Sequence, residues 1–356
     1  MFPRLIAGPS GASTGRLRCR QQELGGEIMR RRDFLTMTAG TTGVATGLLA
    51  PMRASLAQGD YPSRPVRVMV GFAAGGGVDI AARLIGDWLS QRLGQPFIVE
   101  NRTGADGNIA TEAVIKAPPD GHTLLLATLP NAVNATLYPK LDFVFLRDIA
   151  PVAGLVRVPM VVLVNPSVPV KSLAELIAYA RDNPAKISMA SAGTGSAPHM
   201  AGELFNAMAG IKMVHVPYRG QGPALSDLLG GQVQILFAAA PGTVDYIRSG
   251  KLRALAVTSP TQAEVLKTLP TVADTLPGYE ASQWYGLGAP ARTPVEIIDR
   301  LNREANAALT DAAMKARFAA ISGDPIAGTP AQFGKLIADE TDKWAKVVKS
   351  TGLRIE

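Results

Sequence analysis

The chain has 356 residues, of which 47% are hydrophobic and 18% charged, a balance that excludes disorder for most of it and is typical of about two globular domains. One Cys and three His exclude a disulfide framework and leave too few ligands for a zinc site, so we expect no metal and no cofactor. The net charge of +7 comes mainly from residues 1–57, with eight basic and three acidic residues, whereas residues 58–356 carry 28 and 26, which excludes an extended surface for nucleic acid.

The N-terminal part has the pattern of an export signal. Arg30-Arg31-Arg32-Asp33-Phe34-Leu35 leads into an uncharged segment, residues 34–52, that is rich in Thr and Gly and too weakly apolar for a stable membrane anchor. The segment therefore predicts a signal peptide cleaved after Ala57. Paired arginines before Phe-Leu are typical of the twin-arginine route, and an ordinary secretory signal is the alternative. We expect a soluble protein of the bacterial periplasm.

Export signals begin close to the initiating Met, so we expect translation to start at Met29. Residues 1–57 are then an N-terminal extension followed by the cleaved signal peptide. Cys19 lies before this start, so the mature protein is expected to contain no Cys.

From Pro65 onward, apolar runs alternate with amphipathic helices, which predicts an α/β fold with mostly parallel sheets. The run 152–164 is broken by Pro159 and predicts a strand that passes from one domain to another. Capping boxes predict helix starts at Ser172, Thr293 and Thr329. A helix is expected at 78–93, and strands at 66–72, 97–100, 123–128, 187–191, 213–216, 234–238, 252–258 and 284–289.

Two glycine-bearing connections between a predicted strand and a predicted helix are candidate anion sites. The first loop, residues 72–79, carries Gly75-Gly76-Gly77, and its main-chain amides converge on a helix N-terminus, where an anion is favoured. It lacks the Gly-Lys-Ser/Thr of a nucleotide-binding loop, and a tight turn is the alternative interpretation. The second loop, residues 191–199, adds the hydroxyls of Thr194 and Ser196, and a hydroxyl-capped helix is its alternative.

Other polar residues give weaker signals. Tyr218 and Arg219 could contact a carboxylate, although for Arg219 an ordinary surface position is the favoured interpretation. His122, His199 and His215 share no metal-ligand spacing, and each is consistent with a structural role. No acid, base and nucleophile come together in the sequence, so the chain is expected to bind a small anion and not to be an enzyme.

Over nearly the whole mature chain the sequence resembles the Bug/TctC family of extracytoplasmic solute receptors. The resemblance rests on Gly71-Phe72-Ala73-Ala74-Gly75-Gly76-Gly77-Val78-Asp79 and Glu100-Asn101-Arg102-Thr103-Gly104-Ala105-Asp106-Gly107-Asn108. Further matching segments follow in the family's order at residues 191–199, 216–220, 227–233, 250–258, 284–287 and 289–294.

The resemblance implies a two-lobed periplasmic binding protein with a hinged cleft, lobe 1 being 58–160 plus 287–356 and lobe 2 being 161–286. It implies a monomeric receptor that binds a small organic carboxylate and delivers it to the membrane subunits of a tripartite tricarboxylate transporter. Carried over by position, the expected ligand-binding residues are Phe72, Ala73, Ala74, Gly75, Gly76, Asp79, Thr128, Asn131, Ser191, Gly193, Thr194, Gly195, Ser196, His199 and Tyr218.

The sequence departs from the family at Ala239-Ala240, where relatives often carry an acidic or amide pair, and this favours a bulkier or less polar carboxylate. Two alternatives to a transport receptor stay open. One is an exported serine-type hydrolase in which Ser196 is the nucleophile and His199 the nearby base. The other is a ligand sensor for a signalling partner.

Overall fold

The structure is a computed structural model and describes residues 61–184, 186–240, 242–260 and 268–355. The export signal, its cleavage after Ala57 and the start at Met29 lie outside the described residues and stay predictions. Among the helices of the described ranges, none combines the length and the apolar character needed to cross a membrane.

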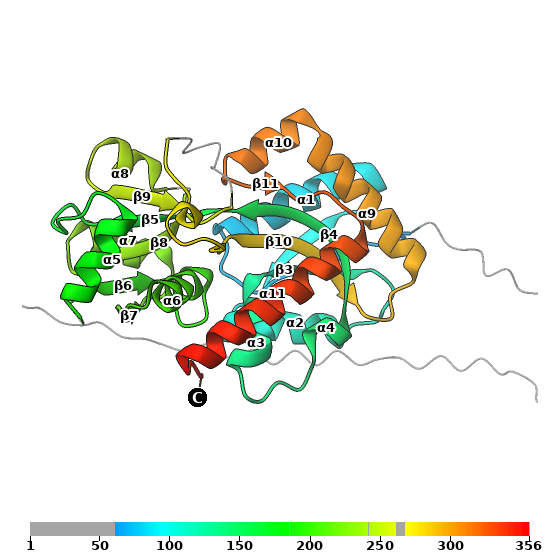
Figure 1. The fold of residues 1–356 in the computed structure, drawn as a ribbon. Coiled ribbons are helices and arrows are strands. Elements are labelled where there is room, and N and C mark those ends of the chain that lie inside the picture. The colour runs from blue at the N-terminus through cyan, green and yellow to red at the C-terminus, as the bar shows by residue number, and fades with distance from the viewer. Residues whose placement is uncertain (1–60, 185, 241, 261–267, 356) are drawn as a thin grey trace, which may run out of the picture. The chain divides into compact units, whose positions relative to one another are not determined.

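The chain forms two sheets flanked by helices (Figure 1), so the predicted α/β class is confirmed. The six-stranded first sheet has the order β11-β4-β10-β3-β1-β2, and the five-stranded second sheet has the order β7-β6-β8-β5-β9. The strands of the first sheet are β1 (Val66–Val70), β2 (Phe97–Asn101), β3 (Thr123–Thr128), β4 (Ile149–Val158), β10 (Gln283–Pro290) and β11 (Asp324–Pro325). Those of the second are β5 (Met160–Val164), β6 (Ser188–Ser191), β7 (Val214–Pro217), β8 (Ile235–Ala239) and β9 (Arg253–Val257).

The expectation of mostly parallel sheets is wrong. Each sheet contains two parallel pairings: β1 runs parallel to β2 and β3, and β6 runs parallel to β7 and β8. The remaining pairings, β10 with β3 and β4, β11 with β4, and β5 with β8 and β9, are antiparallel. The physical reason is that β5 and β10 arrive from the other sheet, so no helical crossover within one sheet sets their direction.

The chain passes between the sheets at Pro159, as the broken apolar run predicts. β4 ends at Val158 and β5 begins at Met160, and Pro159 has no N–H to contribute to either ladder. The chain returns in β10, which pairs with the first sheet from Gln283 onward, earlier than the expected boundary at residue 287. We call the elements around the first sheet lobe 1 and those around the second sheet lobe 2.

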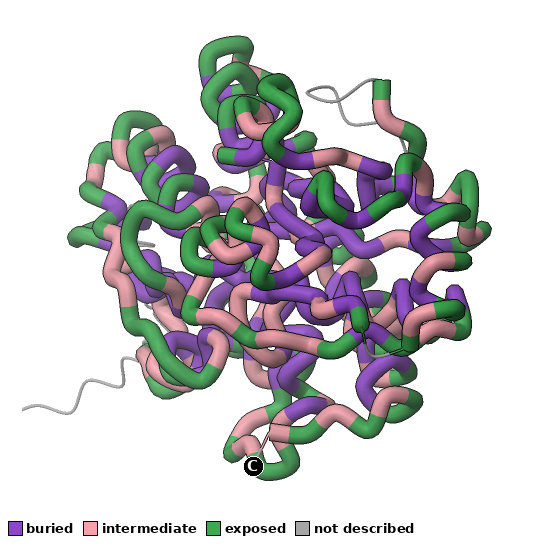
Figure 2. Tube along the Cα trace, turned by 90° about the vertical axis from the view of Figure 1, so that its left-hand side faces the viewer, coloured by how far each residue is buried: buried purple, intermediate pink, exposed green. Residues whose placement is uncertain are grey.

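Helices cover both faces of the first sheet because its side chains alternate. Val66, Val68 and Val70 join a core with α1, α9 and α10, whereas Met69 and Leu125 join one with α2, α3 and α11. Figure 2 shows buried segments inside and exposed segments on the outer helices. The helices of lobe 1 are α1 (Gly77–Leu93), α2 (Asn108–Ile115), α3 (Leu129–Leu137), α4 (Phe145–Asp148), α9 (Val295–Thr310), α10 (Ala312–Ala319) and α11 (Pro330–Thr351). Those of lobe 2 are α5 (Leu173–Asp182), α6 (Ala197–Ala209), α7 (Gln221–Leu229) and α8 (Val244–Arg248).

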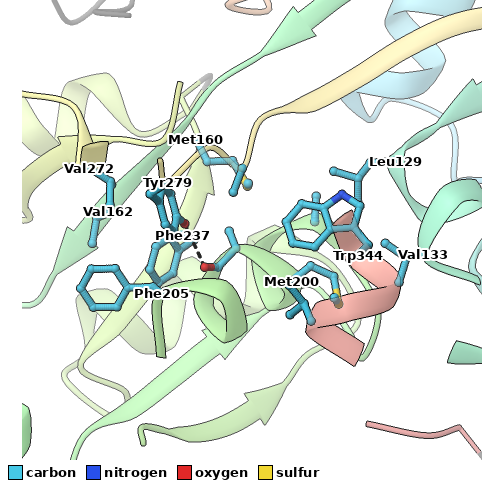
Figure 3. Packing of buried hydrophobic residues seen from close by; sticks show 14 of the residues in the cluster. Leu129, Val133, Met160, Val162, Met200, Phe205, Phe237, Val272, Tyr279 and Trp344 are labelled. Carbon is cyan, nitrogen blue, oxygen red and sulfur yellow. Dashed lines mark hydrogen bonds between the residues drawn. The ribbon is translucent and has the colours of Figure 1, made fainter. Parts of the chain in front are cut away.

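One hydrophobic core extends from lobe 1 into lobe 2. In Figure 3, Trp344 of α11 lies with Leu129 and Val133 of α3 on one side and Met200 of α6 on the other. Its indole N–H donates to Glu340 Oε2 at 2.7 Å, so this large buried side chain is also satisfied as a donor. The C-terminal helix therefore packs on both lobes.

The three predicted capping boxes have different outcomes. At Thr329 both bonds form: Gln332 N–H donates to Thr329 Oγ1 at 3.2 Å, and Thr329 N–H donates to Gln332 Oε1 at 2.8 Å. Ser172 accepts from Glu175 N–H at 3.2 Å. The Thr293 box is wrong, because α9 begins at Val295 after Pro294, and Thr293 Oγ1 is buried without a hydrogen-bond partner in the described part of the chain.

Candidate functional site

The first loop exposes the N-terminus of α1. Gly76 is the last residue before the helix, and Gly75 has a φ of +82°, a left-handed conformation that glycine adopts without strain. Residues 73–76 are exposed, and the first N–H groups of a helix have no acceptor within the helix. The loop thus offers main-chain donors to an anion from solvent.

Hydrogen bonds to the Asp79 side chain hold this loop in place. Its buried carboxylate accepts from Gly75 N–H at 2.9 Å, from Arg83 Nε at 2.9 Å and from Asn101 Nδ2 at 2.9 Å. Burial alone would raise the pKa of Asp79, but these hydrogen bonds outweigh it and keep the pKa below its usual value. The side chain that the sequence placed among the ligand contacts is therefore engaged inside the chain.

The second loop has the same organisation at the N-terminus of α6. Gly193 and Gly195 have φ values of +134° and +82°. The hydroxyls of Ser191 and Ser196 both donate to Gly193 O, at 3.0 and 2.7 Å. Ser196 N–H also donates to Gly193 O, at 3.3 Å, so both serine hydroxyls and this N–H are used inside the loop.

A pair of buried imidazoles supports the second loop. His199 Nδ1 accepts from Gly195 N–H at 3.0 Å, and its ring stacks on His215 with centroids 3.7 Å apart. Nε2 of His215 lies 2.6 Å from Ser191 Oγ. Burial lowers the pKa of His199 to about 3, with a smaller contribution from His215, and lowers that of His215 to about 4. Both rings are therefore neutral at pH 7.

The proposed hydrolase pair is not formed. Ser196 Oγ donates to a carbonyl, and His199 Nδ1 already accepts a main-chain N–H, so the two side chains are not bonded to each other. The structure instead brings Ser191 to His215, but Ser191 is fully buried and closed to a substrate. These contacts give neither serine the accessible base that nucleophilic catalysis needs.

Thr128 and Asn131 lie at the carboxyl end of β3, where α3 begins. Asn131 Oδ1 accepts from Thr128 N–H at 2.8 Å, and its Nδ2 donates to Thr111 Oγ1 at 2.9 Å. Both residues are buried, so they fix the chain at this edge. Tyr285 of β10 pairs with Thr128, and its hydroxyl would lie 3.3 Å from a methyl group added at Gly77.

Tyr218 joins β7 to the second loop. Its N–H donates to Ser191 O at 3.0 Å, and its hydroxyl donates to Asp227 Oδ2 at 2.7 Å, which raises the pKa of Tyr218 to about 12. Gly220 N–H donates to Ala192 O at 3.2 Å. The phenol is thus bonded within lobe 2.

Both loops border one segment, residues 104–108, which we call the junction turn. A methyl group at Gly71, directly before the first loop, would lie 2.4 Å from Gly107 Cα, so the two main chains touch. A methyl group at Gly195 of the second loop would lie 2.5 Å from Leu137 Cδ2 and 3.5 Å from Asp106 Oδ2. Neither Asp106 nor Tyr285 was predicted as a functional residue, although both lie in segments that carry the resemblance.

Elsewhere in the described chain, neither a surface cavity nor a cluster of metal ligands competes with the two loops as a binding site. A separate surface cavity is lined by Arg147, Asp148 and Arg292 among others, and no predicted ligand-binding residue reaches it. The described residues contain no group of three or more His, Cys, Asp or Glu that could hold a metal ion.

Comparisons with known proteins give a consistent picture. A family described as "Tripartite tricarboxylate transporter family receptor" matches residues 81–353. Protein BugT of Bordetella pertussis is 39% identical over 313 residues, which cover 87% of this chain and 95% of BugT. A protein of the tcbD-tcbE intergenic region of Pseudomonas sp. is 36% identical over 290 residues, which cover 81% of this chain and 86% of that protein.

Solved structures of similar fold include complexes with carboxylates. "R. palustris Rpa4515 with adipate" has a TM-score of 0.76 and 36% identity, and the match covers 83% of this chain and 100% of that one. "MatC (Rpa3494) from Rhodopseudomonas palustris with bound malate" has a TM-score of 0.72 and 33% identity over 81% of this chain and 100% of that one. The periplasmic binding protein BugD has a TM-score of 0.73 and 33% identity, with coverages of 83% and 100%.

Proposed function

Because the chain belongs to the family of tripartite tricarboxylate transporter receptors, we propose that it binds a small organic carboxylate between its two lobes in the periplasm. The observation that carries the proposal is the approach of both loops to the junction turn: Gly71, directly before the first loop, packs on Gly107, and Gly195 of the second loop faces Asp106 Oδ2. Each loop lies at the N-terminus of a helix of more than three turns, one helix in each lobe. Adipate and malate, the molecules bound to two of the similar structures, are small organic carboxylates.

In this proposal the carboxylate is held by the main-chain N–H groups of Ala73, Ala74, Gly76 and Thr194. Those of Gly75, Gly193, Gly195 and Ser196 already donate to acceptors within the chain. A hydrogen bond to a charged group contributes about 1.5–3 kcal/mol, and a helix N-terminus adds about 0.3–1 kcal/mol. A few such bonds suffice for micromolar binding without a basic side chain. The side chains of Asp79, Asn131, His199 and Tyr218 would act on the ligand indirectly, because their hydrogen bonds hold the two loops in place.

The proposed lobes are residues 58–160 with 287–356, and residues 161–286. The change of sheet at Pro159 supports the first boundary, and the pairing of β10 with β4 from Gln283 onward supports a return to the first sheet close to the second. Two crossings of this kind are suited to hinge closure on a ligand. We propose that a monomer, exported by its signal peptide, delivers the ligand to the transporter's membrane subunits.

Binding without catalysis is the function that the hydrogen bonds of the second loop favour. Replacing Ser196 with Ala removes one hydroxyl that donates to Gly193 O and no group that is bonded to His199. We expect carboxylate binding by Ser196→Ala to stay within about threefold of wild type, the effect of about 0.6 kcal/mol. If the wild type has a hydrolytic activity that Ser196→Ala abolishes, the protein is instead a hydrolase with Ser196 as its nucleophile.

The direct test is a thermal-shift series with the purified protein and a panel of mono-, di- and hydroxycarboxylates, followed by calorimetric titration of each responder. A ligand at about 100 times its dissociation constant adds about 2.7 kcal/mol to the stability of the folded state. A folded protein that responds to none of these acids would refute the proposed function.

A further inference from the structure

The junction turn presents a carboxyl group where the two lobes meet. Asp106 Oδ2 lies 3.5 Å from the position that a methyl group on Gly195 would take, so this oxygen faces the second loop of lobe 2 although Asp106 belongs to lobe 1. On the other side of the same turn, Gly107 packs on Gly71 and on the Phe72 ring. A group held here lies beside both sets of main-chain donors.

The junction turn contains two non-glycine residues in the left-handed conformation. Ala105 and Asp106 have φ values of +45° and +48°, in the left-handed region that residues with a Cβ avoid. Asn134 Nδ2 stabilises the turn by donating to Asp106 O at 3.1 Å. Tyr138 Oη donates to Asp106 Oδ2 at 3.1 Å and orients the side chain. Strained backbone kept in place by neighbouring groups is typical of functional sites.

Unpartnered polar atoms lie around the same turn. Asn134 Nδ2 also donates to Asn108 Oδ1 at 2.9 Å, and the two residues are 1% and 6% exposed. Asn134 Oδ1 and Asn108 Nδ2 have no hydrogen-bond partner in the described part of the chain. A buried acceptor and a buried donor without partners are costly, so this cluster has capacity for a polar group that comes from outside the chain.

Asp106 itself has capacity for one more donor. It forms no ion pair with the residues that the structure describes, and only Tyr138 donates to its carboxylate there. Burial raises the pKa of Asp106, because little surrounding charge stabilises its anion. A ligand group that donates a hydrogen bond, above all a cationic one, would supply the second partner that the described chain does not give this carboxylate.

We propose that Asp106 is a specificity-determining residue that recognises a hydrogen-bond donor, an ammonium or hydroxyl group, on the carboxylate ligand. This inference rests on the proposed function and narrows it to a substrate class: acids that carry a hydrogen-bond donor in addition to the bound carboxylate. A second carboxylate in place of that donor would be repelled by Asp106. The small residues Ala239-Ala240 favour a less polar ligand, but Asp106 adds a polar contact from the opposite lobe.

The experiment compares acids of equal length. Dissociation constants are measured by calorimetry for hexanoate, adipate and 6-aminohexanoate, and for butanoate, succinate and 4-aminobutanoate. The protein is used as wild type, as Asp106→Asn and as Asp182→Asn, a control that removes the same charge at an exposed position at the end of α5. We expect the wild type to bind the amino acid of each set at least about tenfold more tightly than the diacid, since hydrogen bonds between charged groups are the strong ones.

Asp106→Asn is expected to weaken binding of the amino acid by about tenfold and to strengthen binding of the diacid, whereas Asp182→Asn changes neither. Asp106→Gly is the second variant, because glycine adopts the positive φ of this position without strain and also removes the carboxyl group. Wild-type preference for the diacids, unchanged in both Asp106 variants, would overturn the inference and leave the proposed function intact. Failure of the folded wild type to bind any of the six acids would refute both.

Discussion

Replacing Gly76 with Val tests the first loop with little effect on the fold. Gly76 has φ −78° and ψ 165°, an extended conformation that a β-branched residue favours. A methyl group there would have only Ala73 O nearby, at an ordinary 3.5 Å. The added side chain would instead occupy the space from which an anion approaches the first N–H groups of α1.

The expected loss follows from the number of main-chain donors that become blocked. Each bond to a charged acceptor contributes about 1.5–3 kcal/mol, so loss of one raises the dissociation constant by about 10- to 100-fold. At a ligand concentration that is about 100 times the wild-type dissociation constant, the stabilisation would fall from about 2.7 to about 0.4 kcal/mol for a 100-fold weaker variant. The thermal shift of the wild type, about 5 °C, would then nearly vanish.

Gly230→Val is the matched control. Gly230 has a φ of −77° and its added methyl group would lie 3.5 Å from Ser226 O, the same kind of contact, but it follows α7 and lies outside both loops. We expect calorimetry to give a wild-type dissociation constant for this control. If both variants bind with wild-type affinity, the first loop is not part of the site. If both lose affinity equally, the loss comes from damage to the fold and not from a blocked site.

Three further outcomes are expected. Trp344→Ala removes a fully buried indole from the core shared by the lobes and should lower the free energy of unfolding by about 3–5 kcal/mol, and an unchanged urea midpoint would contradict that role. Burial holds the pKa of His199 at about 3 and that of His215 at about 4, below the 6.5 of an unfolded chain, so the unfolded state binds more protons as the pH falls. The free energy of unfolding should therefore keep its full value above about pH 6.5. Toward pH 4 it should fall by up to about 1.4 kcal/mol per pH unit for each ring. His199→Asn should retain ligand affinity, because its Oδ1 can replace Nδ1 as the acceptor for Gly195 N–H, whereas His199→Leu should lose it. Equal dissociation constants for the two variants would show that His199 does not position the second loop.

The sequence predicted those structural features that depend on residues close to one another in the chain. The turn at residues 75–77, the start of the helix after it and the box at Thr329 depend on residues within one or two turns of each other, and the structure contains them. The resemblance to the Bug/TctC family is confirmed by the family match and by BugT. Strand direction in β5 and β10 was not predictable in this way, because it depends on which sheet the chain has just left.

The same distinction applies to the candidate site. Gly75 and Gly195 signal their loops by residue type alone, since positive φ angles favour glycine. By contrast, the engagement of Asn131 depends on Thr111, and that of Tyr218 on Asp227. Partners of this kind are distant in the chain or on another element, so polar side chains that looked available to a ligand are bonded internally.

This internal bonding also decides where ligand selectivity can come from. Arg83 of α1 is bonded to Asp79 through both Nε and a terminal nitrogen, and His199 is neutral and buried. The remaining contacts to a carboxylate are main-chain N–H groups, which bind any carboxylate of suitable shape and do not distinguish one metabolite from another. Discrimination then requires a side chain beside both loops that still has hydrogen-bonding capacity. Within the described residues Asp106 meets this requirement, because its carboxylate faces Gly195 of the second loop and accepts only from Tyr138.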